Sequence, residues 1–179
     1  MRTFLAVEIP EHSRRLIDNF IQIQAKRELP IKWVRFENLH ITLRFLGEID
    51  EGRKQGILPV VAEVAKEYRP FTVQLAGLGC FPGPRNPRVL WVGAKQGSEE
   101  LHEIATELEK ALTKIGFKAE QRFHAHLTIG RIKKHCQVDD ILAQPISSEP
   151  FEADSITLFK STLRPEGPIY EGLYKFTLG

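Results

Sequence analysis

The chain has 179 residues, 42% of them hydrophobic and 27% charged, which excludes a disordered protein and fits one compact unit or two lobes sharing a core. A net charge of +2 provides no broad positive surface for duplex nucleic acid, although local positive charge can still hold a small anion. Only two cysteines occur, Cys80 and Cys136, so a disulfide framework and a Cys-rich zinc site are both excluded.

The first half of the chain alternates between strand-like and helix-like patterns. Period-two alternation and β-forming residues predict strands at 3–9, 33–34, 39–46 and 71–81. Apolar residues at helical spacing predict helices from residue 11 to about 26 and over 50–68. Pro10 and Pro30 separate the first helix from its neighbours.

The second half begins with a strand at 89–94, after a Pro-rich basic loop that contains Arg85 and Arg88. A helix then follows, with Ser98 expected as its N-cap and Gly116 as its stop. Further strands are expected at 125–132, 155–163 and 173–178, with a turn at 165–168 between the last two.

An internal repeat relates the two halves. A shift of 86 residues places residues 4–7 on 90–93, the first helix on the Ser98 helix, and residues 40–43 on 126–129. We therefore expect an α+β fold with two pseudo-symmetric lobes, each an antiparallel sheet with helices outside. Residues 1–179 would form a single duplicated domain with the active-site cleft between the lobes, where ligands commonly bind.

The motif His-x-Thr occurs twice, at residues 40–42 and 126–128, at equivalent points of the repeat. Six His and nine Thr in this chain predict only about 0.3 such matches by chance, so two matches in equivalent strands are informative. The alternative is two half-buried histidines that are hydrogen-bonded to their neighbours and have no catalytic role.

Residues two apart on a strand share a face, so His40 lies beside Thr42, and His126 beside Thr128. The opposite face would then be buried, including Phe45 in the first motif. Two imidazoles with ordinary pKa values near 6.5 can act as acid and base at neutral pH, and threonine hydroxyls can donate to phosphoryl oxygens. The quartet suits in-line attack at phosphorus, without indicating which histidine is the acid.

The whole chain resembles the RNA 2′,3′-cyclic phosphodiesterases, or 2′-5′ RNA ligase-like proteins, of the two-histidine phosphoesterase superfamily. The matching stretches are residues 2–7, 38–47, 87–93, 126–131, 158–163 and 167–170. Ala125 is a local departure, because the family often has proline just before the second motif. The resemblance implies that His40 is the general acid, that His126 is the general base, and that Arg131 contacts the substrate.

The implied reaction opens an RNA 2′,3′-cyclic phosphate to a 2′-phosphomonoester, with no metal or other cofactor. Thr42, Thr128 and Arg131 would hold the phosphoryl oxygens. The reverse reaction, with an RNA 5′-hydroxyl in place of water, would form a 2′-5′ linkage. Alternatives are a superfamily phosphodiesterase for small cyclic nucleotides or 2′-5′ oligonucleotides, and a non-catalytic module that binds RNA ends.

Other polar clusters allow weaker interpretations. His124 and His126 could both bind a metal, but no third ligand stands at a recognisable spacing. The carboxylate-free segment 121–138 and the loop at Arg85–Arg88 are candidate RNA contacts, or only solvated surface and a connector. Strand parity directs Arg131 away from His126, unless a bulge at Gly130 re-aims it.

The expected partners are RNA ends or a cyclic nucleotide, and the protein is expected to be a monomer. No apolar run approaches the roughly 18 residues that a membrane helix needs, and the short apolar N-terminus is interrupted by Glu8. We expect neither a membrane partner nor a signal peptide, and a cytoplasmic location.

Overall fold

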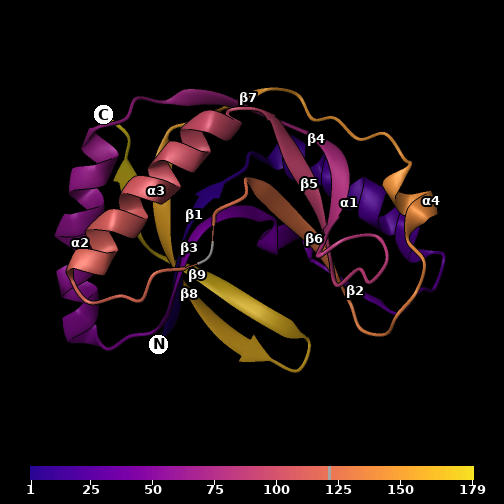
Figure 1. Ribbon diagram of the computed structural model, residues 1–179, viewed down its shortest axis with the longest axis horizontal. Helices are drawn as coiled ribbons and strands as arrows, with labels where there is room; N and C mark the ends of the chain where they lie inside the picture. The colour runs from indigo at the N-terminus through magenta and orange to yellow at the C-terminus, as the bar shows by residue number, and fades with distance from the viewer. Residues whose placement is uncertain (121) are drawn as a thin grey trace.

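The structure, a computed structural model, describes residues 1–120 and 122–179 and is built on two antiparallel sheets (Figure 1). One sheet has the order β3-β1-β8-β9, from strands His40–Glu48, Arg2–Glu8, Ser155–Arg164 and Gly167–Thr177. The other has the order β2-β6-β5-β4-β7, from strands Ile31–Trp33, His126–Ile132, Val89–Gln96, Phe71–Phe81 and Phe151–Ala153.

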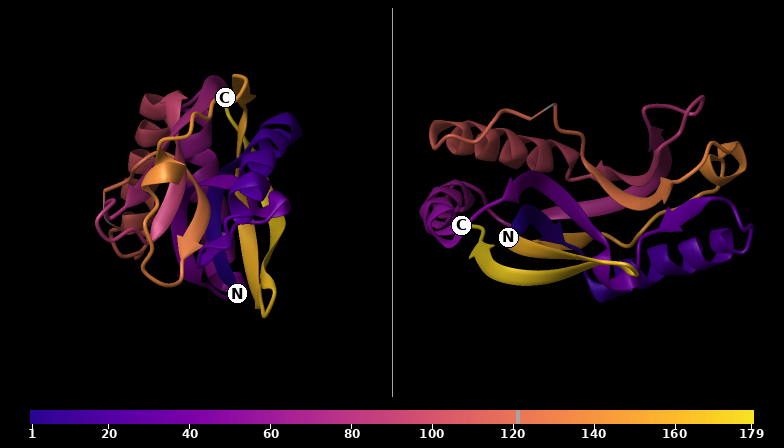
Figure 2. Two further views of the ribbon diagram at one scale, coloured as in Figure 1. Left: turned by 90° about the vertical axis from the view of Figure 1, so that its right-hand side faces the viewer. Right: turned by 90° about the horizontal axis from the view of Figure 1, so that it is seen from below.

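The helices lie on the outer sides of these sheets (Figure 2). They are α1 (Glu11–Ala25), α2 (Glu51–Lys66), α3 (Ser98–Lys114), the short α4 (Asp139–Leu142) and a single 3₁₀ turn, η1 (Phe36–Asn38). Helix α3 lies beside α2 and packs against β3 and β5, whereas α1 packs against β2 and η1. The predicted α+β class, with two antiparallel sheets and helices outside, is confirmed.

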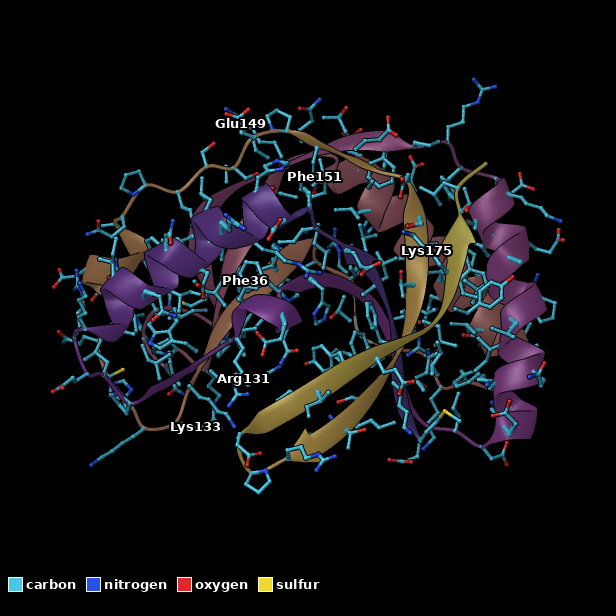
Figure 3. All side chains as sticks on the ribbon, turned by 180° about the vertical axis from the view of Figure 1, so that it is seen from behind. Phe36, Arg131, Lys133, Glu149, Phe151 and Lys175 are labelled. Atoms are coloured by element: carbon cyan, nitrogen blue, oxygen red, sulfur yellow. The ribbon has the colours of Figure 1, made fainter. Side chains whose placement is uncertain are left out.

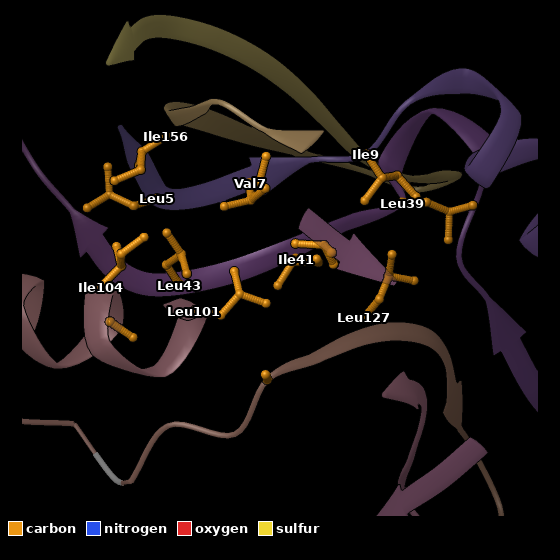
Figure 4. Close-up of a cluster of buried hydrophobic side chains, with 14 of the residues drawn as sticks. Leu5, Val7, Ile9, Leu39, Ile41, Leu43, Leu101, Ile104, Leu127 and Ile156 are labelled. Carbon is orange, nitrogen blue, oxygen red and sulfur yellow. The ribbon is translucent and has the colours of Figure 1, made fainter. Parts of the chain in front are cut away.

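One hydrophobic core connects the two sheets (Figure 4). Leu5 on β1, Ile41 on β3, Leu101 on α3 and Leu127 on β6 are each fully buried within it. Burial of an aliphatic side chain of this size contributes about 1.5–3 kcal/mol. Ile41 and Leu127 are the second residues of β3 and β6, and both face inward. Their sequence neighbours His40 and His126 are therefore directed away from the core.

Several element boundaries differ from expectation. Strand β9 begins at Gly167 rather than near residue 173, because the β8–β9 hairpin pairs down to Arg164 and Gly167. The segment 167–172 shows little strand pattern in its own sequence, and its pairing with β8 keeps it extended. The sequence also did not predict η1, α4 and β7, which are all short.

The start of α3 corrects the expected N-cap. Ser98 is the first helical residue, and Gly97 occupies the cap position in the left-handed region with φ 87°. A Cβ on Gly97 would lie 2.6 Å from the Thr72 carbonyl oxygen and 2.9 Å from Val73 Cγ2. The sharp turn out of β5 therefore requires glycine here, and this requirement displaces serine from the cap.

Gly97→Ala is expected to reduce the free energy of unfolding by about 1–3 kcal/mol, because alanine is strained at this φ and meets the β4 backbone. Urea unfolding followed by circular dichroism measures the change. Gly83→Ala is the control, since a Cβ there meets nothing within 4 Å, and a change below about 1 kcal/mol is expected. Equal unfolding midpoints for the two variants would contradict this account.

Candidate active site

His40 is the first residue of β3 and pairs with Glu8 on β1. Its Nδ1 lies 2.6 Å from the Asn38 carbonyl oxygen, which can only accept, so Nδ1 carries a hydrogen and donates it. Its Nε2 lies 2.8 Å from Thr42 Oγ1. In the neutral ring, Nε2 is thus an acceptor for the Thr42 hydroxyl.

Three aromatic rings enclose His40. The ring centroids of Phe4, Tyr170 and Phe159 lie 4.9, 5.2 and 6.4 Å from that of His40, and Tyr170 meets the imidazole edge-on at 83°. Burial lowers the pKa of His40 to about 4, although the hydrogen bond to Asn38 opposes the shift. His40 is therefore neutral at pH 7 in the free protein.

His126 occupies the equivalent position on β6. Its Nδ1 donates to the His124 carbonyl oxygen at 2.6 Å, which repeats the contact between His40 and Asn38. The ring of Phe81 stands edge-on to the imidazole, with centroids 5.0 Å apart. Burial lowers the pKa of His126 as well, although the hydrogen bond that it donates to the His124 carbonyl oxygen opposes the shift. Fixing Nδ1 as the donor makes Nε2 the reactive nitrogen in both histidines.

The structure brings the two motifs together. Strand β3 packs against β6 across the junction of the sheets, and the positive charge of His126 is one of the causes that lower the pKa of His40. Thr42 is hydrogen-bonded to His40, and Thr128 is two residues along the strand from His126, half-buried and paired with Trp91.

A β-bulge decides the orientation of Arg131. In the β5–β6 ladder Trp91 pairs with Thr128 and Leu90 with Gly130, so Ile129 is an extra residue and reverses the alternation. Ile129 and Gly130 are both buried, and Arg131 turns outward to the face of His126. Its positive charge lowers the pKa of His126 and acts in the same direction on Tyr170.

A bulge at the same point of β3 makes the expected burial of Phe45 wrong. Leu5 pairs with Arg44 and Ala6 with Thr42, so Leu43 is the extra residue. Arg44 is turned into the core, and Phe45 is 50% exposed, with its ring centroid 6.1 Å from that of Phe4. Phe45 therefore belongs to the face of β3 that carries His40.

The predicted basic segment surrounds the second motif, although Gln121 lies outside the described residues. Figure 3 shows Arg131 and Lys133 at the C-terminal end of β6. The loop at Arg85–Arg88 joins this end, because Arg88 accepts a backbone hydrogen bond from Ile132. The positive side chains at 85–88 and 131–134 thus lie along one end of the sheet.

A cavity of about 790 Å³ lies at the other end of β6, next to the residues that precede His126. Its charged and imidazole lining residues are Lys95, Glu99, His102, Glu103, Arg122 and His124. The rings of His124 and His126 have centroids 6.0 Å apart. In the described part of the chain, no group of three His, Cys, Asp or Glu side chains is placed to hold a metal ion, so this pair has no third ligand.

Sequence reasoning missed two neighbours of His40. Asn38 acts through its backbone carbonyl, and its side-chain Nδ2 donates to the Pro168 carbonyl oxygen at 2.9 Å, which ties η1 to the start of β9. Tyr170 reaches His40 from β9, 130 residues along the chain. No local pattern indicates either contact.

The fold and the paired His-x-Thr strands define a phosphoesterase of the two-histidine class. The model of the LigT-like phosphoesterases matches the chain twice, over residues 7–91 and 92–170. The chain belongs to this family.

Curated relatives and solved structures agree with that assignment. An RNA 2′,3′-cyclic phosphodiesterase of Archaeoglobus fulgidus is 39% identical and covers 98% of this chain and 99% of the relative. One of Methanocaldococcus jannaschii is 41% identical, over 96% of this chain and 97% of the relative. The crystal structure of a Thermus thermophilus protein, TT0787, superposes with a TM-score of 0.84 at 29% identity, covering 99% and 98% of the two chains. That of Escherichia coli LigT with NADP⁺ superposes with a TM-score of 0.80 at 25% identity, covering 99% and 96%.

Proposed function

We propose that this protein hydrolyses 2′,3′-cyclic phosphate ends of RNA to 2′-phosphomonoesters, with His126 as general base and His40 as general acid. The activity for which the relatives from Archaeoglobus fulgidus and Methanocaldococcus jannaschii are named supports the reaction. The observation that carries the mechanism is the repeated contact of Nδ1 with a backbone carbonyl, which leaves Nε2 of each histidine for proton transfer.

The reaction proceeds in line at phosphorus. Nε2 of neutral His126 accepts a proton from water as the water oxygen bonds to phosphorus. The bond from phosphorus to O3′ breaks, and protonated His40 donates its Nε2 hydrogen to that oxygen. Thr42, Thr128 and Arg131 donate hydrogen bonds to the non-bridging oxygens, where negative charge increases in the transition state.

This division of roles requires His40 to gain a proton when substrate binds. Its free-protein pKa of about 4 leaves it neutral at pH 7, with Nε2 accepting from Thr42. An anionic phosphodiester beside the ring stabilises the imidazolium and raises the pKa. The substrate thus supplies the charge that converts His40 into an acid.

The pKa of His40 is expected to be about 4 in the free protein and to rise when inorganic phosphate binds. Because the acid must be protonated, activity is lost as the pH rises through the pKa of His40. As the pH rises, kcat/KM, which reports the free enzyme, should therefore begin to fall at a lower pH than kcat, which reports the complex. NMR titration of the imidazole resonances, with and without phosphate, measures both values. A free-protein pKa near 6.5, or no rise on binding, would refute this account.

Turnover of oligoribonucleotides ending in a 2′,3′-cyclic phosphate tests the proposed function. The expected product is the 2′-phosphate, which chromatographic mobility against 2′- and 3′-phosphate standards distinguishes from the 3′-phosphate. Activity is expected to survive EDTA, because side chains supply both proton transfers. A 3′-phosphate product, or turnover that requires Zn²⁺ or Mn²⁺, would count against the proposal.

The alternatives give different results in the same assay. An enzyme for small cyclic nucleotides turns over a cyclic mononucleotide at least as well as a short RNA. A non-catalytic module retains RNA with a cyclic phosphate end and releases no product. Incubation with a 5′-hydroxyl RNA measures the reverse reaction, which would form a 2′-5′ linkage at the same site.

We further infer that residues 1–179 act as one duplicated unit that binds RNA ends as a monomer. The two family matches and the shared core support the single duplicated unit. Among the described residues, no helix is both long and apolar enough to cross a membrane. The free thiols of Cys80 and Cys136 support a cytoplasmic location.

A further inference from the structure

Arg44 is a buried cation close to the first histidine motif. It follows Thr42 by two residues on β3, and the bulge at Leu43 turns it inward. Its side chain is only 5% exposed. A guanidinium so far from solvent is tolerated only when charged and polar partners surround it.

These partners come from α3, from the segment that follows it and from β3 itself. Arg44 Nε lies 2.8 Å from Glu109 Oε2 on α3, and Nη1 lies 2.9 Å from Glu120 Oε1. Nη1 also donates to the Phe45 carbonyl oxygen, and Nη2 donates to that of Lys118. The Glu120 backbone N–H donates to Glu109 Oε1 at 2.9 Å, which closes the cluster.

Residues 118 and 120 belong to the segment that links α3 to β6. Near its end lies His124, whose carbonyl oxygen accepts the Nδ1 hydrogen of His126. In the described part of residues 118–125, the hydrogen bonds and ion pairs to the rest of the protein come from Arg44, Glu109 and His126. Arg44 therefore supplies two of these four polar contacts, and its partner Glu109 supplies a third.

We propose that Arg44 is a positioning residue for His126. It fixes the start of the segment whose end orients the imidazole, and it does so from the strand that carries His40. The cluster thus sets the position of one histidine relative to the other. This inference rests on the proposed function for its kinetic consequence, but not for its structural one.

The test uses substitutions of graded severity. Arg44→Lys keeps the charge but cannot contact Glu109, Glu120 and Lys118 together, because an ammonium lacks the planar fork. Glu120→Gln removes one ion pair and leaves Arg44 paired with Glu109. Glu107→Gln is the matched control, since it removes the exposed ion pair with Lys110 on α3, the helix that also carries Glu109. Glu120→Gln decides the matter if Arg44→Lys does not fold.

Kinetics are measured on a cyclic-phosphate RNA well below each variant's melting temperature. Arg44→Lys and Glu120→Gln are expected to lower kcat about 3- to 30-fold with little change in KM, because misplacing a catalytic group by a fraction of an ångström slows the chemical step. Glu107→Gln should match the wild type. A kcat equal to that of the wild type in both folded variants would overturn the proposal, however much their melting temperatures fall.

The pH profile provides a readout that stability alone does not change. His126 must be neutral, so activity is lost as the pH falls below its pKa, which burial holds under the ordinary value. A loosened segment hydrates the ring, and the acidic limb should move to higher pH in both variants. The other titratable or charged groups that face His126 are His124, Arg131 and His40, and all three variants retain them.

NMR separates failure of this inference from failure of the proposed function. The His126 imidazole resonances should shift in Arg44→Lys and Glu120→Gln, but not in Glu107→Gln, with no substrate present. If the wild type does not turn over cyclic-phosphate RNA but these shifts occur, only the proposed function fails. If the wild type is active and the shifts are absent, Arg44 does not position His126.

Discussion

His126→Ala is expected to lower kcat/KM for cyclic-phosphate RNA by about 10²- to 10⁴-fold, which is the usual contribution of a general base. The variant lacks the only imidazole nitrogen that the structure directs from β6 toward the site, with its tautomer fixed by the His124 carbonyl. Water then attacks without a proton acceptor, whatever the leaving group. An aryl phosphodiester with an activated leaving group should therefore not rescue the activity.

His12→Ala is the control for this measurement. His12 is exposed near the start of α1, outside the basic segment 121–138, so its substitution removes the same type of side chain away from that segment. The variant should retain the wild-type rate. Activity of His126→Ala within tenfold of the wild type would eliminate His126 as the base.

His40→Ala is expected to be comparably severe on RNA, again by about 10²- to 10⁴-fold, because the departing O3′ then leaves as an unprotonated alkoxide. An aryl leaving group needs no proton, so the same variant should recover much of its rate on an activated aryl phosphodiester. The ring of His40 also packs against Phe4 and Tyr170, and His40→Gln tests whether lost packing contributes.

Comparison of the two variants assigns the roles without reference to any relative. Rescue of His40→Ala alone identifies His40 as the acid. Rescue of His126→Ala alone would reverse the assignment, and equal rescue of both would mean that neither residue acts as proposed. Unfolding curves for each variant show that the rates refer to folded protein.

Sequence pattern was sufficient for the main elements and for the faces of the two motifs. Strand alternation directs Ile41 and Leu127 inward, so that His40 and His126 had to face outward. The rule failed where a strand gains a residue. At Gly130 the glycine gave a local signal of the bulge, whereas nothing in Leu43 or Arg44 indicates that Phe45 turns outward.

Contacts between distant parts of the chain were beyond sequence reasoning. Tyr170 reaches His40 through a hairpin whose second strand is held by pairing rather than by its own pattern. The partners of Arg44 come from α3 and from the segment after it, 65 and 76 residues along the chain. A buried arginine on a strand predicts that carboxylates are close, but not which ones.

The matching bulges have a consequence for how selectivity can diverge. In each half, a side chain five residues after the motif histidine faces the same way as that histidine. It is Phe45 in one half and Arg131 in the other. The extra residue of each bulge lies after the motif threonine. The backbone pairing that holds each histidine does not depend on the side chain at these two positions. Arg131 nevertheless lowers the pKa of His126, so a change there alters proton transfer together with ligand choice. Phe45 is not among the causes of either histidine's pKa shift, so position 45 is where variation or design can change ligand choice while leaving proton transfer intact.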